Sequence, residues 1–565
     1  MAKKLKAPWL GSYGGRQKSV KWPDGSLYDM VADGAKNWPE RTALEYFGRK
    51  ISYAEFLNQI DGAARGLKAL GVAPGDSVAV CSANIPEGVV AIYAASKIGA
   101  IANVFHPLSA PNEIKHYLNL AKSKVLVAID VSWPNIAPII KETGVKTSVI
   151  ISPSDSLPRL MKIGFKISAF LPGSKKTPKP AGENVITWAE MLSRGSQITG
   201  DVHHKMKTDD VAAVLYSGGT TGSPKGVALS NRSFNAMAVQ IREFFPEYVI
   251  PGNTILGIMP IFHGFGLGVG VHLMLTNGLG VILLPKFNVK KFDKILAHSR
   301  PSFLCGVPTL YEAMLKNKKI AKLDLSFVKL AINGGDALSN NLKQAIDELL
   351  ARGGSQAKLT EGYGLTECLS AVIITPVEKY KPDTIGIPMA NVFAKIVEPN
   401  TYIEKKLGEV GEIVLTGPNL MSGYVGDAKE TNAALQKHPD GRIWLHTGDL
   451  GTMDKDGYIF FRQRLKRMII SSGYNIYPTQ IEKVIQQLPE VLMATVVGLP
   501  DAYRGQIAKA FVVLKPGAKK AGMEDKIMAH CRENLAKYEW PRQIEFRDSL
   551  PKTGIGKVAY GELTK

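Results

Sequence analysis

Cysteine is scarce in this chain of 565 residues, in which it occurs at only four positions. These positions, Cys81, Cys305, Cys368 and Cys531, are far apart and form no CxxC pair. The pattern therefore predicts neither a disulfide framework nor a zinc site, and it favours a reducing, cytoplasmic setting. The first residues are basic but no apolar run follows them, so we do not expect a secretory signal.

Charged side chains are missing from one long stretch, residues 255–284, which must be considered as a membrane span. The stretch contains Pro260, His263, Asn277 and seven glycines. These residues suit a buried strand–loop–helix–strand better than a helix that faces lipid.

The balance of charge is strongly basic, with a formal net charge of +20. The lysines and arginines are spread along the chain without an aromatic-interleaved stripe, so nucleic acid is not an expected partner. An anionic membrane surface, anionic substrates or a generally basic surface would each account for the charge. In the segment 153–180, which looks inserted, a helix over 159–171 would place Arg159, Lys162 and Lys166 on one face. That helix could contact a membrane peripherally or pack on its own domain, and the sequence leaves both open.

Apolar residues make up 45% of the chain and charged residues 21%, which is typical of a globular protein with several cores. Aliphatic runs alternate with helical patterns such as 53–70 and 340–351, which predicts an α/β fold with buried sheets. The expected strands are 77–81, 125–129, 148–152, 212–216, 255–259, 281–284, 330–332 and 413–416.

A compact α+β pattern closes the chain, with helices expected at 479–487 and 523–535 and strands at 493–497 and 509–514. We place the domain boundary near Lys466. The prediction is a large N-terminal domain, 1–465, of sheets layered with helices, followed by a small mobile α+β domain, 466–565.

The loop 216–227 follows an expected strand and contains four glycines, four hydroxyl side chains and one lysine. Glycines let backbone N–H groups turn toward an anion, and Lys225 adds a positive charge. The composition predicts a polyphosphate site. It is not a Walker loop, because Gly226 rather than Ser or Thr follows the lysine. The other expected donors are Ser217, Gly218, Gly219, Thr220, Thr221 and Gly222.

Five further segments accompany this loop in a fixed order: 361–367 (EGYGLTE), 408–424 (GEVGEI and GPNLMSGY), 446–450 (HTGDL), 464–466 (RLK) with Gly473 downstream, and 551–557 (PKTGIGK). Together they resemble the adenylate-forming superfamily, which holds acyl-CoA synthetases, peptide-synthetase adenylation domains and luciferases. The resemblance runs from about residue 53 to residue 557. It implies a fold of two domains and the activation of a carboxylic acid by ATP.

The resemblance also implies roles for individual residues in binding ATP and its Mg²⁺. Glu367 would hold Mg²⁺, with Ser217 as a second ligand, and Thr366 would donate to the α-phosphate. Tyr363 would lie on adenine unless it is a core residue, and Asp449 would accept from the ribose hydroxyls near Arg464. The remaining expected ATP contacts are Gly335, Asp336, Ala337, Glu361, Gly362 and Gly364.

In the small domain, the resemblance makes Lys557 the catalytic cation and Lys466 the hinge. Ser472 and Gly473 would line the channel for CoA. In the larger domain, Phe262, His263, Gly264 and Gly266 stand where relatives line the acyl pocket. These glycines either open a tunnel for an alkyl chain or allow close packing, and His263 is either a gate or a core histidine.

The leading hypothesis is a ligase that joins a medium- or long-chain fatty acid to CoA, with ATP and Mg²⁺ as cofactors. The alternatives are a ligase for an aromatic or other acid, a carrier-protein-loading enzyme, a luciferase-like oxygenase and a non-catalytic nucleotide-binding scaffold. The presence of Lys225, Glu367, Asp449, Arg464 and Lys557 together argues against the scaffold. The oligomeric state is not predicted.

Overall fold

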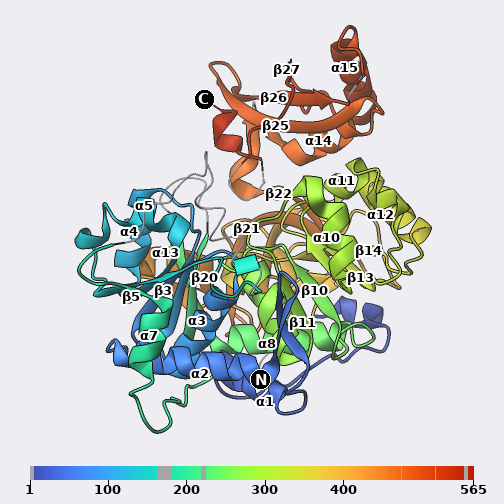
Figure 1. Ribbon diagram of the computed structural model, residues 1–565. Helices are drawn as coiled ribbons and strands as arrows, with labels where there is room; N and C mark the ends of the chain where they lie inside the picture. The colour runs from blue at the N-terminus through green and yellow to red at the C-terminus, as the bar shows by residue number, and fades with distance from the viewer. Residues whose placement is uncertain are drawn as a thin grey trace. The chain divides into compact units, whose positions relative to one another are not determined.

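The computed structural model describes residues 6–158, 161–162, 181–217, 224–471, 474–515, 517–552 and 558–564. The chain forms two compact units. The first unit comprises Met1–Phe393 and Thr416–Leu445, and the second comprises Ala394–Leu415 and His446–Lys565. Figure 1 labels their helices and strands.

An eight-stranded sheet in the first unit has the order β19-β9-β8-β4-β3-β5-β6-β7. Its central strands are parallel, whereas β8 pairs with β9 as a hairpin and β19 adds antiparallel to β9. The strands are β3 (Ser77–Cys81), β4 (Ile101–Phe105), β5 (Ser123–Ile129), β6 (Thr147–Ile151), β7 (Val185–Thr187), β8 (Val211–Ser217), β9 (Lys225–Ser230) and β19 (Gly423–Tyr424).

A nine-stranded sheet in the same unit has the order β16-β15-β14-β13-β12-β10-β11-β1-β2. The strands from β14 to β1 in that order are parallel. The strands are β1 (Thr42–Tyr46), β2 (Arg49–Ser52), β10 (Thr254–Gly257), β11 (Gly280–Leu283), β12 (Phe303–Gly306), β13 (Leu330–Gly334), β14 (Leu359–Tyr363), β15 (Ile373–Ile374) and β16 (Ile387–Pro388).

A layer of helices lies between these sheets: some of its members contact the eight-stranded sheet, others contact the nine-stranded sheet, and the two groups pack on each other. Helix α3 (Pro86–Lys97) is buried along its whole length and packs on β3 and β4. The π-helix η4 (Phe265–His272) continues into α9 (Leu273–Thr276) and contacts β10 and α8 (Asn231–Phe244). The other helices of the unit are α1 (Leu27–Ala35), α2 (Tyr53–Ala69), α4 (Pro111–Leu120), α5 (Trp133–Ile136), α7 (Trp188–Gly195), α10 (Phe292–Ser299), α11 (Pro308–Lys316), α12 (Asn340–Arg352) and α13 (Ala428–Ala434).

The second unit contains a five-stranded sheet of order β24-β23-β26-β25, with β27 on β26. Its strands are β23 (Ile469–Ser471), β24 (Tyr474–Ile476), β25 (Val491–Asp501), β26 (Gly505–Leu514) and β27 (Gln543–Phe546). Helices α14 (Pro478–Gln486) and α15 (Met523–Asn534) bury their apolar faces in its core. Another sheet consists of β17 (Phe393–Val397), β18 (Gly411–Thr416), β20 (Leu435–Lys437), β21 (Ile443–Met453) and β22 (Ile459–Arg464).

The predicted α/β fold is confirmed, and each expected strand coincides with an observed one to within two residues at its start, except that the strand expected at 509–514 begins four residues earlier, at Gly505. The charge-free stretch 255–284 is β10, η4, α9 and β11, which is the strand–loop–helix–strand expected of a core segment. Among the described residues, no helix is both long and apolar enough to cross a membrane. The proposed helix 159–171 lies outside the described residues, apart from positions 161 and 162.

Candidate functional site

Two of the predicted ATP-binding segments leave the nine-stranded sheet at the same edge. Strand β13 ends at Gly334 and leads into Gly335, Asp336 and Ala337, all of which are exposed. Its parallel neighbour β14 contains Glu361, Gly362 and Tyr363, and Gly334 lies opposite Gly362. Because ligands of parallel α/β sheets bind beyond the carboxyl ends of the strands, this edge is a suitable place for a nucleotide.

The turn that follows β14 is fixed by close backbone contacts. A Cβ on Gly364 would lie 1.1 Å from the Ser370 carbonyl oxygen, so the position requires glycine. The 3₁₀ helix Thr366–Cys368 follows, and Leu369 ends it in the left-handed region at φ 66°. This turn presents Thr366 and Glu367 at the strand ends.

The Glu367 carboxylate is partly buried and accepts a hydrogen bond of 2.9 Å from the Tyr424 hydroxyl. Burial and the charge of Glu367 raise the pKa of Tyr424, so that hydroxyl stays protonated and donates. Met421 N–H donates to the Glu367 carbonyl at 2.8 Å, which fixes the backbone as well. A sequence pattern alone did not reveal Tyr424 as a partner of Glu367, although it ends the GPNLMSGY segment.

A single carboxylate of this kind fits Mg²⁺, which is usually bound by one or two carboxylates together with substrate phosphates. Among the described residues, no group of three His, Cys, Asp or Glu side chains could hold a metal by itself. Glu367 with phosphate oxygens is therefore a better match than an all-protein site.

The predicted phosphate loop joins β8 to β9 in the eight-stranded sheet. Ser217 is the last residue of β8 and pairs with Lys225, the first of β9. Lys225 forms an ion pair with Glu430, and its Nζ lies 4.8 Å from the centre of the Tyr424 ring. The intervening residues Gly218, Gly219, Thr220, Thr221 and Gly222 lie outside the described residues.

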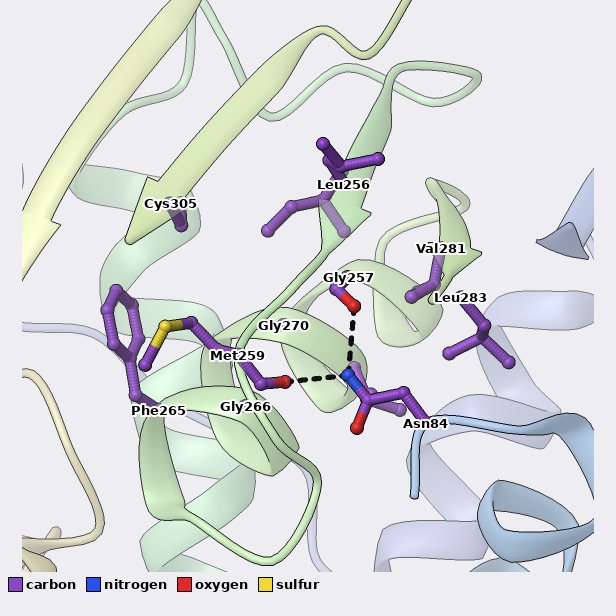
Figure 2. A pocket seen from close by; sticks show the side chains of 12 residues that line it. Asn84, Leu256, Gly257, Met259, Phe265, Gly266, Gly270, Val281, Leu283 and Cys305 are labelled. Carbon is purple, nitrogen blue, oxygen red and sulfur yellow. Dashed lines mark hydrogen bonds between the residues drawn. The ribbon is translucent and has the colours of Figure 1, made fainter. Parts of the chain in front are cut away.

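An apolar pocket lies where the chain reverses its order in the nine-stranded sheet, at β10, β11 and β12 (Figure 2). Phe265 and Met259 lie on one side of it, and Val281 and Leu283 on the other. Asn84 closes it by donating to the Gly257 carbonyl at 2.8 Å and to the Met259 carbonyl at 2.9 Å. The cavity volume is about 10 Å³, which is close to the space that one water molecule needs. Its walls are apolar, and the segments that line it would have to move apart to admit an alkyl chain.

Two glycines of the predicted acyl pocket, Gly264 and Gly266, make close backbone contacts. A Cβ on Gly264 would lie 1.7 Å from the Leu369 carbonyl oxygen, and one on Gly266 would lie 1.9 Å from that of Pro260. Gly266 nevertheless lines the pocket, as does Gly270, whose Cβ would have its nearest neighbour at 3.7 Å. Gly264, which directly precedes the pocket-lining Phe265, thus packs against Leu369 at the end of the turn that carries Glu367.

Phe262 and His263 are not among the residues that line this pocket. The buried Phe262 ring packs edge-on against His106, with 4.5 Å between ring centres. His263 is half-buried beside it, and its backbone carbonyl begins the helical turn by accepting a hydrogen bond from Leu267 N–H at 2.8 Å. His106 was not predicted; burial lowers its pKa, and its Nδ1 accepts from Leu108 N–H.

A buried histidine at the end of the π-helix was also missed. His272 is fully buried between the Tyr93 hydroxyl at 3.1 Å from Nδ1 and Asn235 Oδ1 at 3.0 Å from Nε2. The Asn235 amide nitrogen donates to the Gly25 carbonyl, so its oxygen must accept from Nε2–H, and Nδ1 accepts from Tyr93. Burial lowers the pKa of His272 to about 3, which keeps the ring neutral.

In the second unit, Asp449 and Arg464 lie opposite each other on β21 and β22. Arg464 Nε is 3.4 Å from Asp449 Oδ1, and Asp449 is buried while Arg464 is exposed. The preceding loop is fixed by Glu412, which contacts His446 Nδ1 at 2.9 Å and accepts from Gly448 N–H at 2.9 Å. Glu412 belongs to the GEVGEI segment, but its role as a support for Asp449 was not predicted.

The exposed Lys466 lies in a 3₁₀ turn, Leu465–Arg467, before β23. The next residue, Arg467, is fixed by Glu482 at 2.6 Å and by the Tyr560 ring. Ser472, Gly473 and Lys557 lie outside the described residues, so their predicted roles stay predictions. The domain boundary at Lys466 and the assignment of individual site residues stay predictions as well.

Three features are typical of an α/β enzyme that uses a nucleotide: glycines at the ends of β13 and β14, a lysine (Lys225) in the β8–β9 hairpin, and the carboxylate of Glu367. The chain belongs to the AMP-binding enzyme family: residues 31–425 match that family, and residues 480–557 match the AMP-binding enzyme C-terminal domain. The predicted resemblance to adenylate-forming enzymes is thereby confirmed, and with it the class of AMP-forming ligases.

Relatives of this chain match it along almost its whole length. A long-chain-fatty-acid–CoA ligase of Bacillus subtilis is 32% identical over 98% of this chain and 96% of its own length. A protein of the same name from Salmonella typhimurium is 29% identical over 99% of this chain and 98% of its own. Among solved structures, ATP-bound MatB from Rhodopseudomonas palustris has a TM-score of 0.81 at 26% identity, covering 95% of this chain and 98% of that one.

Proposed function

We propose that the protein is an AMP-forming ligase that joins a long-chain fatty acid to CoA. The observation that carries the proposal is the close contact between Gly264 and Leu369, because Gly264 directly precedes the pocket-lining Phe265 and Leu369 ends the turn that carries Glu367. If the segment around Gly266 and Gly270 opened to admit an alkyl chain, the carboxylate of that acid would lie near the nucleotide-binding edge of the sheet. The names of the full-length relatives support the same substrate class.

The reaction has two steps that this set of residues would serve. A carboxylate oxygen attacks the α-phosphorus of ATP, the bond to the β-phosphate breaks, and pyrophosphate leaves. The CoA thiol then attacks the acyl carbon, and AMP leaves. The first step brings two anions together, so it depends on positioning and on positive charge. Lys225 and the loop before it would bind the phosphates, and Lys557 would approach the transferring group.

Mg²⁺, when bound to the phosphates, would neutralise charge that develops on them. Glu367 would hold it, Thr366 would donate to the α-phosphate, and Tyr363 with Gly335–Ala337 would contain the adenine. Asp449 would accept from the ribose hydroxyls. The buried carboxylate of Asp449 is suited to this because it is an acceptor on two oxygens and is oriented by its own loop.

The test is acid-dependent exchange of pyrophosphate into ATP, followed by thioester formation on addition of CoA. Saturated acids of graded chain length would be compared with aromatic and bile-type acids. We expect the rate to rise with chain length and to vanish in Lys557→Ala, whereas Lys519→Ala, an exposed lysine of the same unit, should behave as the unaltered protein. A preference for aromatic acids would contradict the substrate class, and AMP release without any acid would contradict the ligase. Transfer to a carrier protein instead of CoA would contradict the acceptor.

We further propose that the protein meets its acid in the cytoplasm at the surface of an anionic membrane. The net charge of +20 supports this, because basic proteins are attracted to anionic lipids over distances set by salt. Co-sedimentation with anionic vesicles at low salt, absent with neutral vesicles and reversed at high salt, is the expected result. Equal binding to neutral vesicles would contradict it.

A further inference from the structure

The segment Gly423–Glu430 contacts two charged residues of the predicted phosphate site, Glu367 and Lys225. It begins with β19, which pairs antiparallel with β9 so that Tyr424 lies opposite Val227, two residues after Lys225. This pairing places the Tyr424 side chain at the start of β9. Its hydroxyl donates to Glu367 Oε1 at 2.9 Å, and its ring lies 4.8 Å from Lys225 Nζ.

The backbone around Tyr424 is held at several points. Tyr424 N–H donates to Thr431 Oγ1 at 2.8 Å, and Val425 N–H donates to the Gly226 carbonyl at 2.8 Å. The Thr431 hydroxyl in turn donates to the Asp427 carbonyl at 2.7 Å. Tyr424 is therefore rigid enough to orient the carboxylate that it contacts.

Glu430 contributes the second contact of the segment. It lies in the first turn of α13, where its backbone N–H donates to the Asp427 side chain at 2.9 Å. Its carboxylate forms the ion pair with Lys225, and both side chains are partly exposed, at 32% for Lys225 and 45% for Glu430. An ammonium that is neutralised by a carboxylate attracts a phosphate less strongly than one that is not.

We propose that Tyr424 positions Glu367 for the metal–nucleotide complex and that Glu430 competes with the ATP phosphates for Lys225. This rests on the proposed function. Binding of ATP exchanges the Lys225–Glu430 pair for a Lys225–phosphate pair, while the Tyr424–Glu367 hydrogen bond persists and orients the carboxylate. The two residues thus have opposite effects on ATP affinity.

Glu430→Gln tests the competition. A partly exposed ion pair contributes at most about 1 kcal/mol, so the variant should bind a non-hydrolysable ATP analogue about two- to fivefold more tightly by calorimetry. The control is Glu142→Gln, which removes a comparable ion pair with Lys115 (33% and 58% exposed) and should leave affinity unchanged. In a Lys225→Met background the gain should disappear. Weaker binding by Glu430→Gln, or a gain that persists without Lys225, would overturn the competition.

Tyr424→Phe tests the positioning, since it removes the hydroxyl and keeps the ring. Loss of a partner that orients a metal ligand typically weakens metal affinity about 10- to 100-fold. We expect the Mg²⁺ concentration for half-maximal binding of the analogue to rise about 10-fold or more, with binding in EDTA unchanged. The control is Tyr503→Phe, whose ring is 90% exposed.

A structural role for Tyr424 would instead lower the melting temperature of the nucleotide-free protein and weaken binding in EDTA, and that outcome would overturn the positioning. These experiments measure nucleotide binding and need no acid. If the unaltered protein shows no acid-dependent exchange but the affinity changes occur, the proposed function fails and this inference stands. If exchange is present and the affinities do not change, the inference fails alone.

Discussion

The packing of Gly264 against the Leu369 carbonyl predicts that an added methyl group damages the fold and the reaction together. In Gly264→Ala the new Cβ would start 1.7 Å from a backbone oxygen, which cannot rotate away as a side chain would. Overpacking of this kind costs about 1 to 3 kcal/mol, and contact with backbone favours the upper end. For a unit of this size, we expect a melting temperature lower by about 1 to 3 °C.

The matched control is Gly270→Ala in the same π-helix. Its Cβ would meet its nearest neighbour, the Phe265 carbonyl oxygen, at 3.7 Å, which is an ordinary contact. Replacing a helical glycine with alanine stabilises by up to about 1 kcal/mol, so the melting temperature should stay the same or rise slightly. Gly270 lines the apolar pocket, so a methyl group there should hinder its opening and move the preferred acid toward shorter chains.

The assay combines thermal unfolding of both variants with rates on acids of graded length. Gly264→Ala should lose stability and lose rate on every acid alike, whereas Gly270→Ala should keep stability and change only the ranking of acids. The reasoning would be refuted if Gly264→Ala unfolded at the original temperature and shifted the preferred chain length. That result would mean that Gly264 provides space for substrate rather than packing.

Three further predictions concern buried polar groups. The pKa of His272 is about 3 in the folded protein and about 6.5 in the unfolded chain. The free energy of unfolding should therefore be highest above pH 6.5 and decrease below it, by about 1.4 kcal/mol at pH 5.5. Urea unfolding of His272→Gln should show a smaller decrease over the same pH range. Burial raises the pKa of Glu87 to about 7, so ionisation of this carboxyl lowers the free energy of unfolding as the pH rises from about 4.5 to 7. At pH 8, Glu87→Gln should be more stable than the unaltered protein by about 1 to 3 kcal/mol, and equal or lower stability would contradict this. Glu412→Gln can keep both of its contacts, to Gly448 N–H and to His446 Nδ1, only if the imidazole proton moves to Nε2, so the KM for ATP should rise by up to about tenfold with unchanged KM for the acid. An unchanged KM for ATP would show that Glu412 does not support Asp449.

The parts of the site that a sequence reveals are those whose chemistry is local. The glycines of the turn after β14 are required by backbone contacts within a few residues, and so they leave a pattern. The Gly364 position illustrates this, because only glycine fits against Ser370, six residues later.

Contacts between distant segments leave no such pattern. Tyr424 and Glu367 are 57 residues apart, and Lys225 and Glu430 are 205 apart, so their pairing depends on β19 adding to β9. The sequence could place each residue in a motif but could not say which motifs touch. For the same reason the sequence could not show that Gly264 packs against the Leu369 carbonyl while Gly270 lines the pocket.

The contact between Gly264 and Leu369 also constrains how the acid can influence the chemistry. The π-helix segment beginning at Gly264 and the turn that carries Glu367 are in backbone contact through Gly264 and Leu369. Neither segment can move away without leaving a gap, so a displacement of one should move the other. An acid too large for the pocket would push the π-helix against Leu369 and shift the carboxylate that Tyr424 orients. Poor acids should therefore lower the rate of adenylation at saturating acid and not only raise the KM. Selectivity in this enzyme would then depend on the alignment of reacting groups as well as on affinity for the chain.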